Sequence, residues 1–278
     1  MRKLLFCLLM MASAVANAQL TKYDINNDLK VNSADVVEIY NYIINGGSED
    51  PDPSISTFTV NGVSFNMIAV EGGIFQMGNP YGDSNQKPVH SVNLSAYSIG
   101  ETEVTQALWK AVMGTNPSKW QGDNLPVEKI SWDDCQTFIT KLKLLTGKKF
   151  RLPTEAEWEF AAKGGTKSQS YTYSGSNKLS DVAWYKDNSS SMTQEVGTKS
   201  ANELGIYDMS GNVSEWCQDW YEAYSSSAQS DPTGPISGSY RVFRGGGWLS
   251  SAGGCRTSSR SSSTPEDTGS DLGFRLAL

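Results

Sequence analysis

Histidine is nearly absent from this sequence: the 278 residues contain one, His90. A zinc or iron site built from several imidazoles of one chain is therefore excluded. Basic residues are also in the minority, because 23 Lys and Arg stand against 30 Asp and Glu and give a formal net charge of −7. This acidic balance argues against electrostatic binding of nucleic acid or of anionic lipid.

Long apolar runs are lacking beyond the first residues. Residues 1–18 predict a signal peptide, with Arg2 and Lys3 at the start, an apolar run over 4–15 and Ala16-Asn17-Ala18 as a cleavage site. The run is shorter than the ~20 residues of a spanning helix. A cleaved leader is favoured over a membrane anchor, so we expect a secreted, periplasmic or cell-surface protein without a membrane span.

Cysteine is scarce as well. Cys7 lies in the predicted leader, which leaves Cys135, Cys217 and Cys255. Export permits a disulfide, and three thiols permit one bridge with one cysteine left over. The sequence leaves the pairing open.

Oxygen-bearing side chains recur between residues 24 and 35 at the spacing of a calcium loop. A hard cation needs several converging oxygens, and position 7 of such loops contributes a backbone carbonyl. The predicted ligands are Asp24, Asn26, Asp28, Lys30, Asn32 and Asp35. The alternative is half of a helical hairpin that only packs on its neighbour.

Residues 19–46 resemble one repeat of a dockerin module, which implies calcium binding. Leu29 stands where such loops turn on glycine, and a second repeat is missing, so docking on a cohesin is doubtful. Residues 47–56, with paired Gly and alternating Pro, predict a linker. The main domain is expected at 57–278.

Short strands and three helices are expected in this domain, with little helical periodicity past Gly165. Turn and capping residues set the boundaries. The expected elements are a hairpin around Asn61-Gly62, strands at 71–78 and 89–97, and helices near 104–113, from Ser131 to Gly147 and from Thr154, where Glu157 completes a capping box.

Six motifs follow one another in the domain. They are Glu71-Gly-Gly-Ile-Phe-Gln-Met-Gly, Glu101-Thr-Glu-Val-Thr, Pro126-Val-Glu-Lys-Ile-Ser-Trp, Arg151-Leu-Pro-Thr-Glu-Ala-Glu-Trp-Glu, Gly205-Ile-Tyr-Asp-Met-Ser-Gly-Asn-Val-Ser-Glu-Trp and Gly273-Phe-Arg. In this order they resemble the formylglycine-generating enzyme, or sulfatase-modifying factor, family over about residues 64–278. The resemblance implies an α+β, C-type-lectin-like fold that is poor in regular structure and often carries calcium.

Formylglycine-generating enzymes oxidise a substrate cysteine with O2, using two cysteines that bind copper(I). The resemblance places the second of these at Cys255, the first at Ser250 and the serine of the oxygen pocket at Gly247. A serine hydroxyl is a poor ligand for copper(I). We therefore expect neither copper nor the parent activity, and we expect Cys255 to be a buried small side chain or one end of a disulfide.

The family's calcium ligands match Asp208, Gly211, Val213 and Glu215. Two carboxylates and two backbone carbonyls are the donors that calcium prefers. The alternative is that Asp208 and Asn212 only cap turns, and that Glu215 pairs with an arginine such as Arg151.

Small polar residues come in blocks between residues 247 and 271. One interpretation is an ordinary Ser- and Gly-rich loop. However, the block residues are reachable from an Asn codon by changing adenines alone, and the segment resembles the variable region of proteins diversified by retroelements. The resemblance implies a ligand-binding face on a scaffold held by Trp248, Arg256, Arg260 and Arg275. The predicted contacts are Leu249, Ser250, Ser251, Gly253, Gly254, Thr257, Ser259, Ser261, Ser262, Ser263, Thr268, Ser270 and Asp271.

The favoured function is therefore that of a secreted, non-catalytic protein that binds an unknown protein or glycan. The alternative is a formylglycine-generating oxidase that acts on a sulfatase cysteine. A third possibility, an iron-dependent oxygenase, is removed by the single histidine.

Overall fold

The computed structural model describes residues 54–278. The expected signal peptide, the calcium loop with its ligands at 24–35, and the linker as far as residue 53 lie outside the described residues and stay predictions. The first strand begins at Ile55, two residues before the expected start of the domain.

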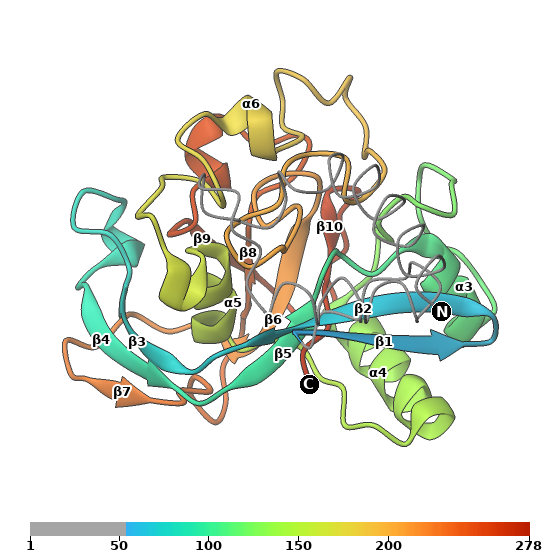
Figure 1. Ribbon diagram of the computed structural model, residues 1–278, viewed down its shortest axis with the longest axis horizontal. Coiled ribbons are helices and arrows are strands. Elements are labelled where there is room, and N and C mark those ends of the chain that lie inside the picture. Colours follow the sequence, from blue (N-terminus) through green and yellow to red (C-terminus); the bar gives the residue numbers. More distant parts are fainter. Residues whose placement is uncertain (1–53) are drawn as a thin grey trace, which may run out of the picture. The chain divides into compact units, whose positions relative to one another are not determined.

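Within residues 54–278, ten short strands and four helices alternate with long loops (Figure 1). The strands are β1 (Ile55–Val60), β2 (Val63–Val70), β3 (Gly73–Met77), β4 (His90–Leu94), β5 (Tyr97–Gly100), β6 (Ser214–Trp220), β7 (Gln229–Ser230), β8 (Arg241–Arg244), β9 (Arg260–Ser263) and β10 (Leu272–Gly273). The helices are α3 (Gln106–Met113), α4 (Trp132–Thr146), α5 (Glu155–Ala162) and α6 (Leu179–Val182), with 3-10 turns η1 (Ser84–Gln86), η2 (Gly165–Lys167) and η3 (Ala252–Cys255).

The strands form three sheets in the orders β1-β2-β5, β10-β6-β8-β9 and β3-β4-β7. The predicted hairpin is present, because Asn61 and Gly62 both have positive φ, as the tight turn between β1 and β2 requires. The strand expected at 89–97 is instead two strands in different sheets. Asp231 interrupts it by accepting hydrogen bonds from the backbone N and Oγ of Ser95.

The helices begin and end where their capping residues predict. Ser131 and Thr154 close capping boxes at the starts of α4 and α5, and Gly147 ends α4 in the left-handed conformation. Thr105 caps α3, so this helix begins at Gln106. Helix α6 was not predicted because four residues are too few to show a helical period.

The end of the chain lies in the core rather than at its edge. Phe274 is fully buried and packs edge-on against Trp109 and Phe138. Leu278 exchanges backbone hydrogen bonds with Ser98 of β5. Residues 272–278, which follow the blocks of small polar residues at 247–271, are therefore part of the core.

Residues 245–271 run between β8 and β10 as loops, the η3 turn and β9 (Figure 1). Both β8 and β10 pair with β6, so the two ends of the segment are attached to one central strand. The sheet therefore fixes both ends of residues 245–271, and many of the residues between these ends lie at the surface.

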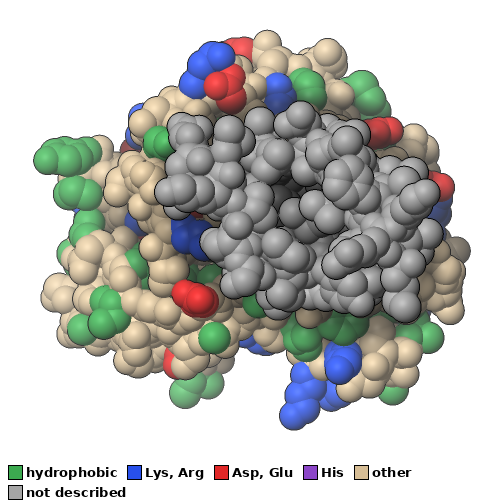
Figure 2. Space-filling model, in the orientation of Figure 1, with side chains coloured by type: hydrophobic (Ala, Val, Ile, Leu, Met, Phe, Trp, Pro, Cys, Tyr) green, Lys and Arg blue, Asp and Glu red, His purple; other side chains and the backbone are tan. Residues whose placement is uncertain are grey.

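The surface visible in Figure 2 carries Lys and Arg side chains in small, separate groups, as far as the described residues are seen there. Among the described residues, no helix combines the length and the apolar character needed to cross a bilayer.

Candidate functional site

Ser250 occupies the position that the resemblance assigns to a copper-binding cysteine. Its Oγ accepts a hydrogen bond of 3.0 Å from the backbone N of Gly247, and its own N donates to the carbonyl of Gly247 at 2.9 Å. The hydroxyl therefore closes a tight turn. A Cβ on Gly247 would lie 2.9 Å from Cβ of Asp271, so a serine cannot stand at this position without a shift.

Cys255 occupies the second position and is fully buried. It packs against Leu179 and Ala183 in and after α6. Burial raises the pKa of its thiol to about 12, so the metal-free thiol is protonated at neutral pH and is a weak nucleophile. Cys135 and Cys217 are also buried, and no disulfide joins the cysteines of residues 54–278. Of the two expectations for Cys255, the structure shows the buried small side chain.

The predicted contact residues of the variable segment lie mostly at the surface. Those that are exposed are Leu249, Ser251, Gly253, Ser261 and Thr268. Those that are partly exposed are Ser250, Gly254, Ser259, Ser262, Ser263, Ser270 and Asp271.

Thr257 is the exception, because its side chain is only 3% exposed. Its carbonyl and that of Ser258 accept hydrogen bonds from the guanidinium of Arg244, which is itself buried. These bonds hold this part of the chain against the core. The prediction that Thr257 contacts a ligand is therefore wrong for this conformation.

Three stretches of the segment contact one another around Trp248. Nε1 of Trp248 donates to the carbonyl of Ser270 at 2.8 Å, and Oγ of Ser259 donates to the carbonyl of Gly253 at 2.7 Å. Residues 247–254, 259 and 268–271 are joined in this way, and we call this group the Trp248 face. The serines of β9 lie on the edge strand of the four-stranded sheet, where they pair with β8.

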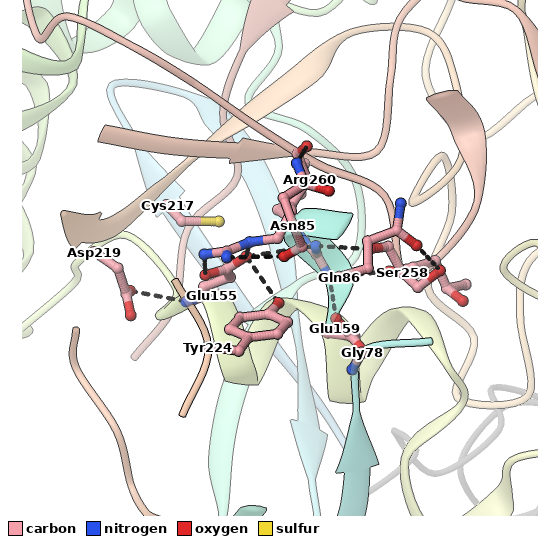
Figure 3. Close-up of polar contacts among 12 residues, drawn as sticks. Gly78, Asn85, Gln86, Glu155, Glu159, Cys217, Asp219, Tyr224, Ser258 and Arg260 are labelled. Carbon is pink, nitrogen blue, oxygen red and sulfur yellow. Dashed lines mark hydrogen bonds and ion pairs between the residues drawn. The ribbon is translucent and has the colours of Figure 1, made fainter. Parts of the chain in front are cut away.

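The expected scaffold residues are buried, with one exception. Nε and Nη2 of Arg260 donate to the carboxylate of Glu155 at 2.7 and 2.6 Å, and the guanidinium lies over the ring of Tyr224 (Figure 3). Arg256 differs, because its side chain is partly exposed and has no hydrogen-bond or ion-pair partner within residues 54–278. Arg256 does not hold the scaffold, contrary to the prediction.

A buried ionic network lies under the segment and on α5. Arg244 pairs with Glu159, which also accepts hydrogen bonds from Lys163 and from the backbone N of Gly78. Asp219 accepts a hydrogen bond of 2.8 Å from the backbone N of Glu155 in the first turn of α5 (Figure 3). Burial, and then the charge of Glu155, raise the pKa of Asp219 to about 8.

The predicted calcium ligand Glu215 is paired with Arg275. Nε and Nη2 of Arg275 donate to the two oxygens of Glu215 at 2.6 Å each, and Nε1 of Trp158 donates to Oε2 at 2.7 Å. The partner is thus not Arg151, which pairs with Glu157.

Three oxygens beside this pair have no hydrogen-bond donor. Oδ2 of Asp208 accepts a hydrogen bond from the backbone N of Gly197, but its Oδ1 is buried without a partner. No hydrogen bond from the described residues reaches the carbonyls of Gly211 and Val213. Within residues 54–278 no group of three or more His, Cys, Asp or Glu side chains is placed to hold a metal. A cation here would need these two carbonyls together with Oδ1 of Asp208, which are oxygen donors of the kind that calcium takes, because both oxygens of Glu215 already accept hydrogen bonds from Arg275.

Glu103 is a third carboxyl group at this place that sequence reasoning missed. It accepts hydrogen bonds of 3.3 Å from the backbone N of Val213 and from Nδ2 of Asn212. Burial, followed by the charges of Asp208 and Glu215, raises the pKa of Glu103 well above its usual value. The available signal was its place in the motif that begins at Glu101.

The comparisons with known proteins agree with this architecture. Residues 54–278 match the family described as "Sulfatase-modifying factor enzyme 1-like domain". The chain is 36% identical to "Chaperone protein LppX" of Paenibacillus barcinonensis, over 77% of this chain and 89% of that protein. It is 29% identical to the formylglycine-generating enzyme of Streptomyces coelicolor, over 82% of this chain and 92% of that enzyme.

Among solved structures, the chain is similar to Treponema denticola variable protein 1, with 39% identity and a TM-score of 0.76. The match covers 82% of this chain and 99% of that chain. The fold predicted from the sequence is confirmed, and so is the resemblance of the C-terminal segment to a variable region.

Proposed function

Because the chain belongs to the sulfatase-modifying factor family but has Ser250 at one of the two copper-binding positions, we propose that it is a non-catalytic protein that displays a ligand-binding face. The state of this site carries the proposal. Ser250 uses its hydroxyl to close a turn, and Cys255 is buried with a pKa of about 12. Copper(I) is held by a pair of soft thiolates, and Ser250 has no sulfur to supply one of the two.

The same site gives the test against an oxidase. We expect that the protein does not convert a Cys-x-Pro-x-Arg peptide to its aldehyde, with or without copper(I), as followed by mass spectrometry. Aldehyde formation that disappears in Cys255→Ala would overturn the proposal in favour of the oxidase.

The display function is supported by the Trp248 face. Apart from Gly247 and Trp248, which are buried, its residues are at least partly exposed and most of them are small, and the chain on both sides is attached to β6. A segment held at both ends can change its side chains with little change of backbone, as antibody loops do. The similarity to Treponema denticola variable protein 1 supports diversification by a retroelement. We propose that the protein is exported and binds a protein or glycan through this face.

A library experiment tests the display function. Leu249, Ser251, Gly253, Ser261 and Thr268 are varied together in the full chain, and the library is selected for binding to lysozyme. The matched control library varies five other exposed positions, in and just after α4, which are Asp133, Thr137, Lys141, Leu144 and Lys148. We expect binders from the first library and few from the second. Equal yields would mean that the variable segment is not a privileged binding surface.

The gene offers an independent test of the diversification mechanism. A neighbouring reverse transcriptase and a near-copy of the last bases of the gene, with Asn codons in the variable blocks, are expected. Their absence would contradict diversification by a retroelement while leaving the binding function open to the library test.

Calcium is the second part of the proposal. Asp208, Gly211 and Val213 would hold the ion, and Glu215 would join them by sharing an oxygen that now accepts a hydrogen bond from Arg275. The ion would supply positive charge to three buried carboxyl groups, those of Glu103, Asp208 and Glu215. The role is structural, since the ion would fix the turn before β6.

A further inference from the structure

Trp120 lies beside the Trp248 face but belongs to a different part of the chain. Its ring packs edge-to-face against the ring of Trp248, with a centroid distance of 5.0 Å and an interplanar angle of 88°. Trp120 is partly exposed and stands in the loop between α3 and α4. It is therefore outside residues 247–271, to which the expected variation is confined.

The loop that carries Trp120 is held from below by two fully buried side chains. Nε2 of Gln106 donates to the carbonyl of Trp120 at 2.8 Å. The carboxylate of Glu128 accepts hydrogen bonds from the backbone N of Trp120, at 3.2 Å, and of Lys119. The backbone of Trp120 is thus fixed in the absence of a ligand, so less conformational entropy is lost when a ligand binds.

The same segment also touches the variable loop. Lys129, next to Glu128, donates its backbone N to the carbonyl of Gly269 at 2.9 Å. The neighbouring residues Glu128 and Lys129 are therefore hydrogen-bonded to the loop of Trp120 and to residues 268–271, respectively. The hydrogen bond between Lys129 and Gly269 joins two backbone atoms, so it uses none of the side chains at the variable positions.

The indole of Trp120 has a free donor. No side chain or carbonyl within residues 54–278 accepts a hydrogen bond from its Nε1, whereas Nε1 of Trp248 is bonded to Ser270. The ammonium of Lys119 lies 4.4 Å from the ring centroid of Trp120 and covers one face of it. A sugar ring that stacks would compete with this cation. An N–H donor beside a partly exposed apolar ring suits a peptide carbonyl and its neighbouring side chains.

Resting on the display function proposed above, we propose that Trp120 is a constant anchor for protein ligands, shared by every variant of the Trp248 face. Small residues such as serine and glycine contribute little contact area, and binding energy in protein interfaces concentrates in a few aromatic anchors. A rigid tryptophan outside the variable positions supplies such an anchor, and the variable residues then supply specificity.

The test uses the lysozyme binders selected from the first library. In the full-length binders, Trp120→Ala should weaken affinity for lysozyme by about tenfold or more, in most sequences and independently of the residues at 249–268. Trp120→Phe should lose less, because it keeps a ring but not the N–H donor. The matched control is Phe75→Ala, which removes a partly exposed ring that also lies under a lysine, Lys163, but stands on β3.

A second measurement needs no mutation. Hydroxyl-radical footprinting of unmodified binders, read by mass spectrometry, should show that oxidation of Trp120 falls when lysozyme is bound. Unchanged oxidation, or folded Trp120→Ala variants that bind as tightly as their parents, would overturn the anchor and leave the display function standing. A library without binders would instead remove the display function, and the anchor with it.

Discussion

Asp219 makes stability depend on pH. Its pKa lies near 8 in the native state, against a usual value of 3.8, because the group is buried and faces Glu155. Between these values the native state holds a proton that the unfolded state has released, so the free energy of unfolding falls as pH rises. The contribution of Asp219 is fully present below about pH 4 and is lost as pH passes 8.

Asp219→Asn should remove this part of the pH dependence, because the amide oxygen can still accept the hydrogen bond from Glu155. Melting temperatures between pH 5 and pH 8 measure the effect, and Asp187→Asn, at an exposed aspartate, is the control. Parallel profiles for the wild type and Asp219→Asn would show that Asp219 is already ionised in the native protein.

A substitution at Asp208 can test calcium binding without breaking the ion pair between Glu215 and Arg275. A ligand that binds only the native state adds about 2.7 kcal/mol at a hundred times its Kd. In a chain that carries Asp24→Ala and Asp35→Ala to silence the predicted N-terminal loop, a chelator should lower the melting temperature, and Asp208→Asn should abolish this response. Glu215→Ala is a poor test, because it leaves Arg275 buried without its partner.

A chelator that changes neither the chain with Asp208 nor the chain with Asn at this position would contradict the calcium site. The buried Oδ1 of Asp208, which has no hydrogen-bond partner, would then lower the stability of the native state. The N-terminal loop is tested in the same way, by comparing chains with and without Asp24→Ala and Asp35→Ala.

The sequence motifs predicted the chemical character of single residues better than they predicted which side chains those residues contact. The loss of a thiol at Ser250 can be read from the sequence, and the buried small side chain was one of the two alternatives expected for Cys255. The pairing of Glu215 with Arg275 joins residues 60 apart, and Glu103 reaches Asn212 from 109 residues away. Such contacts depend on the packed fold, so local patterns could not predict them.

Helix and strand boundaries that depend on residues near in the sequence were predicted. Boundaries that depend on contacts between residues far apart in the sequence were not. The capping boxes of α4 and α5 lie within four residues, whereas the break between β4 and β5 depends on Asp231, 136 residues from Ser95. The inward position of Thr257 likewise requires Arg244.

The variable segment and its supports should respond differently to substitution. Changing Leu249, Ser251, Gly253 and Ser261 together to Asn should cost no more than about 0.5 kcal/mol per site, as at ordinary surface positions. A Cβ at Gly253 has space, since its nearest contact is Oγ of Ser251 at 3.9 Å. By contrast, Trp248→Ala should lower the free energy of unfolding by about 3 to 5 kcal/mol.

Chemical denaturation measures both effects, and Phe274→Ala provides a second core substitution of the same expected size. If the multiple Asn variant lost as much stability as Trp248→Ala, these side chains would belong to the packing of the fold, and the display interpretation would fail.

At the scale of the whole molecule, the order of the chain places the variable segment before the last part of the core. Removing residues 272–278 would take away β10, Phe274 and Arg275, and would leave Glu215 without its buried partner. We expect a chain that ends at residue 271 to show no cooperative melting transition. A normal transition would show that the core closes without its C-terminal residues.

If residues 247–271 are diversified as proposed, the position of residues 272–278 after them determines which new variants can fold. A premature stop within residues 247–271 also deletes residues 272–278, and a frameshift there replaces them with unrelated residues, so in both cases β10, Phe274 and Arg275 are lost from the core. A ribosome must therefore translate every variable codon in frame before the domain can fold, and defective copies fail folding instead of presenting a damaged face. Under the proposed diversification, the requirement to fold would therefore remove out-of-frame copies of the gene product before they could bind a ligand.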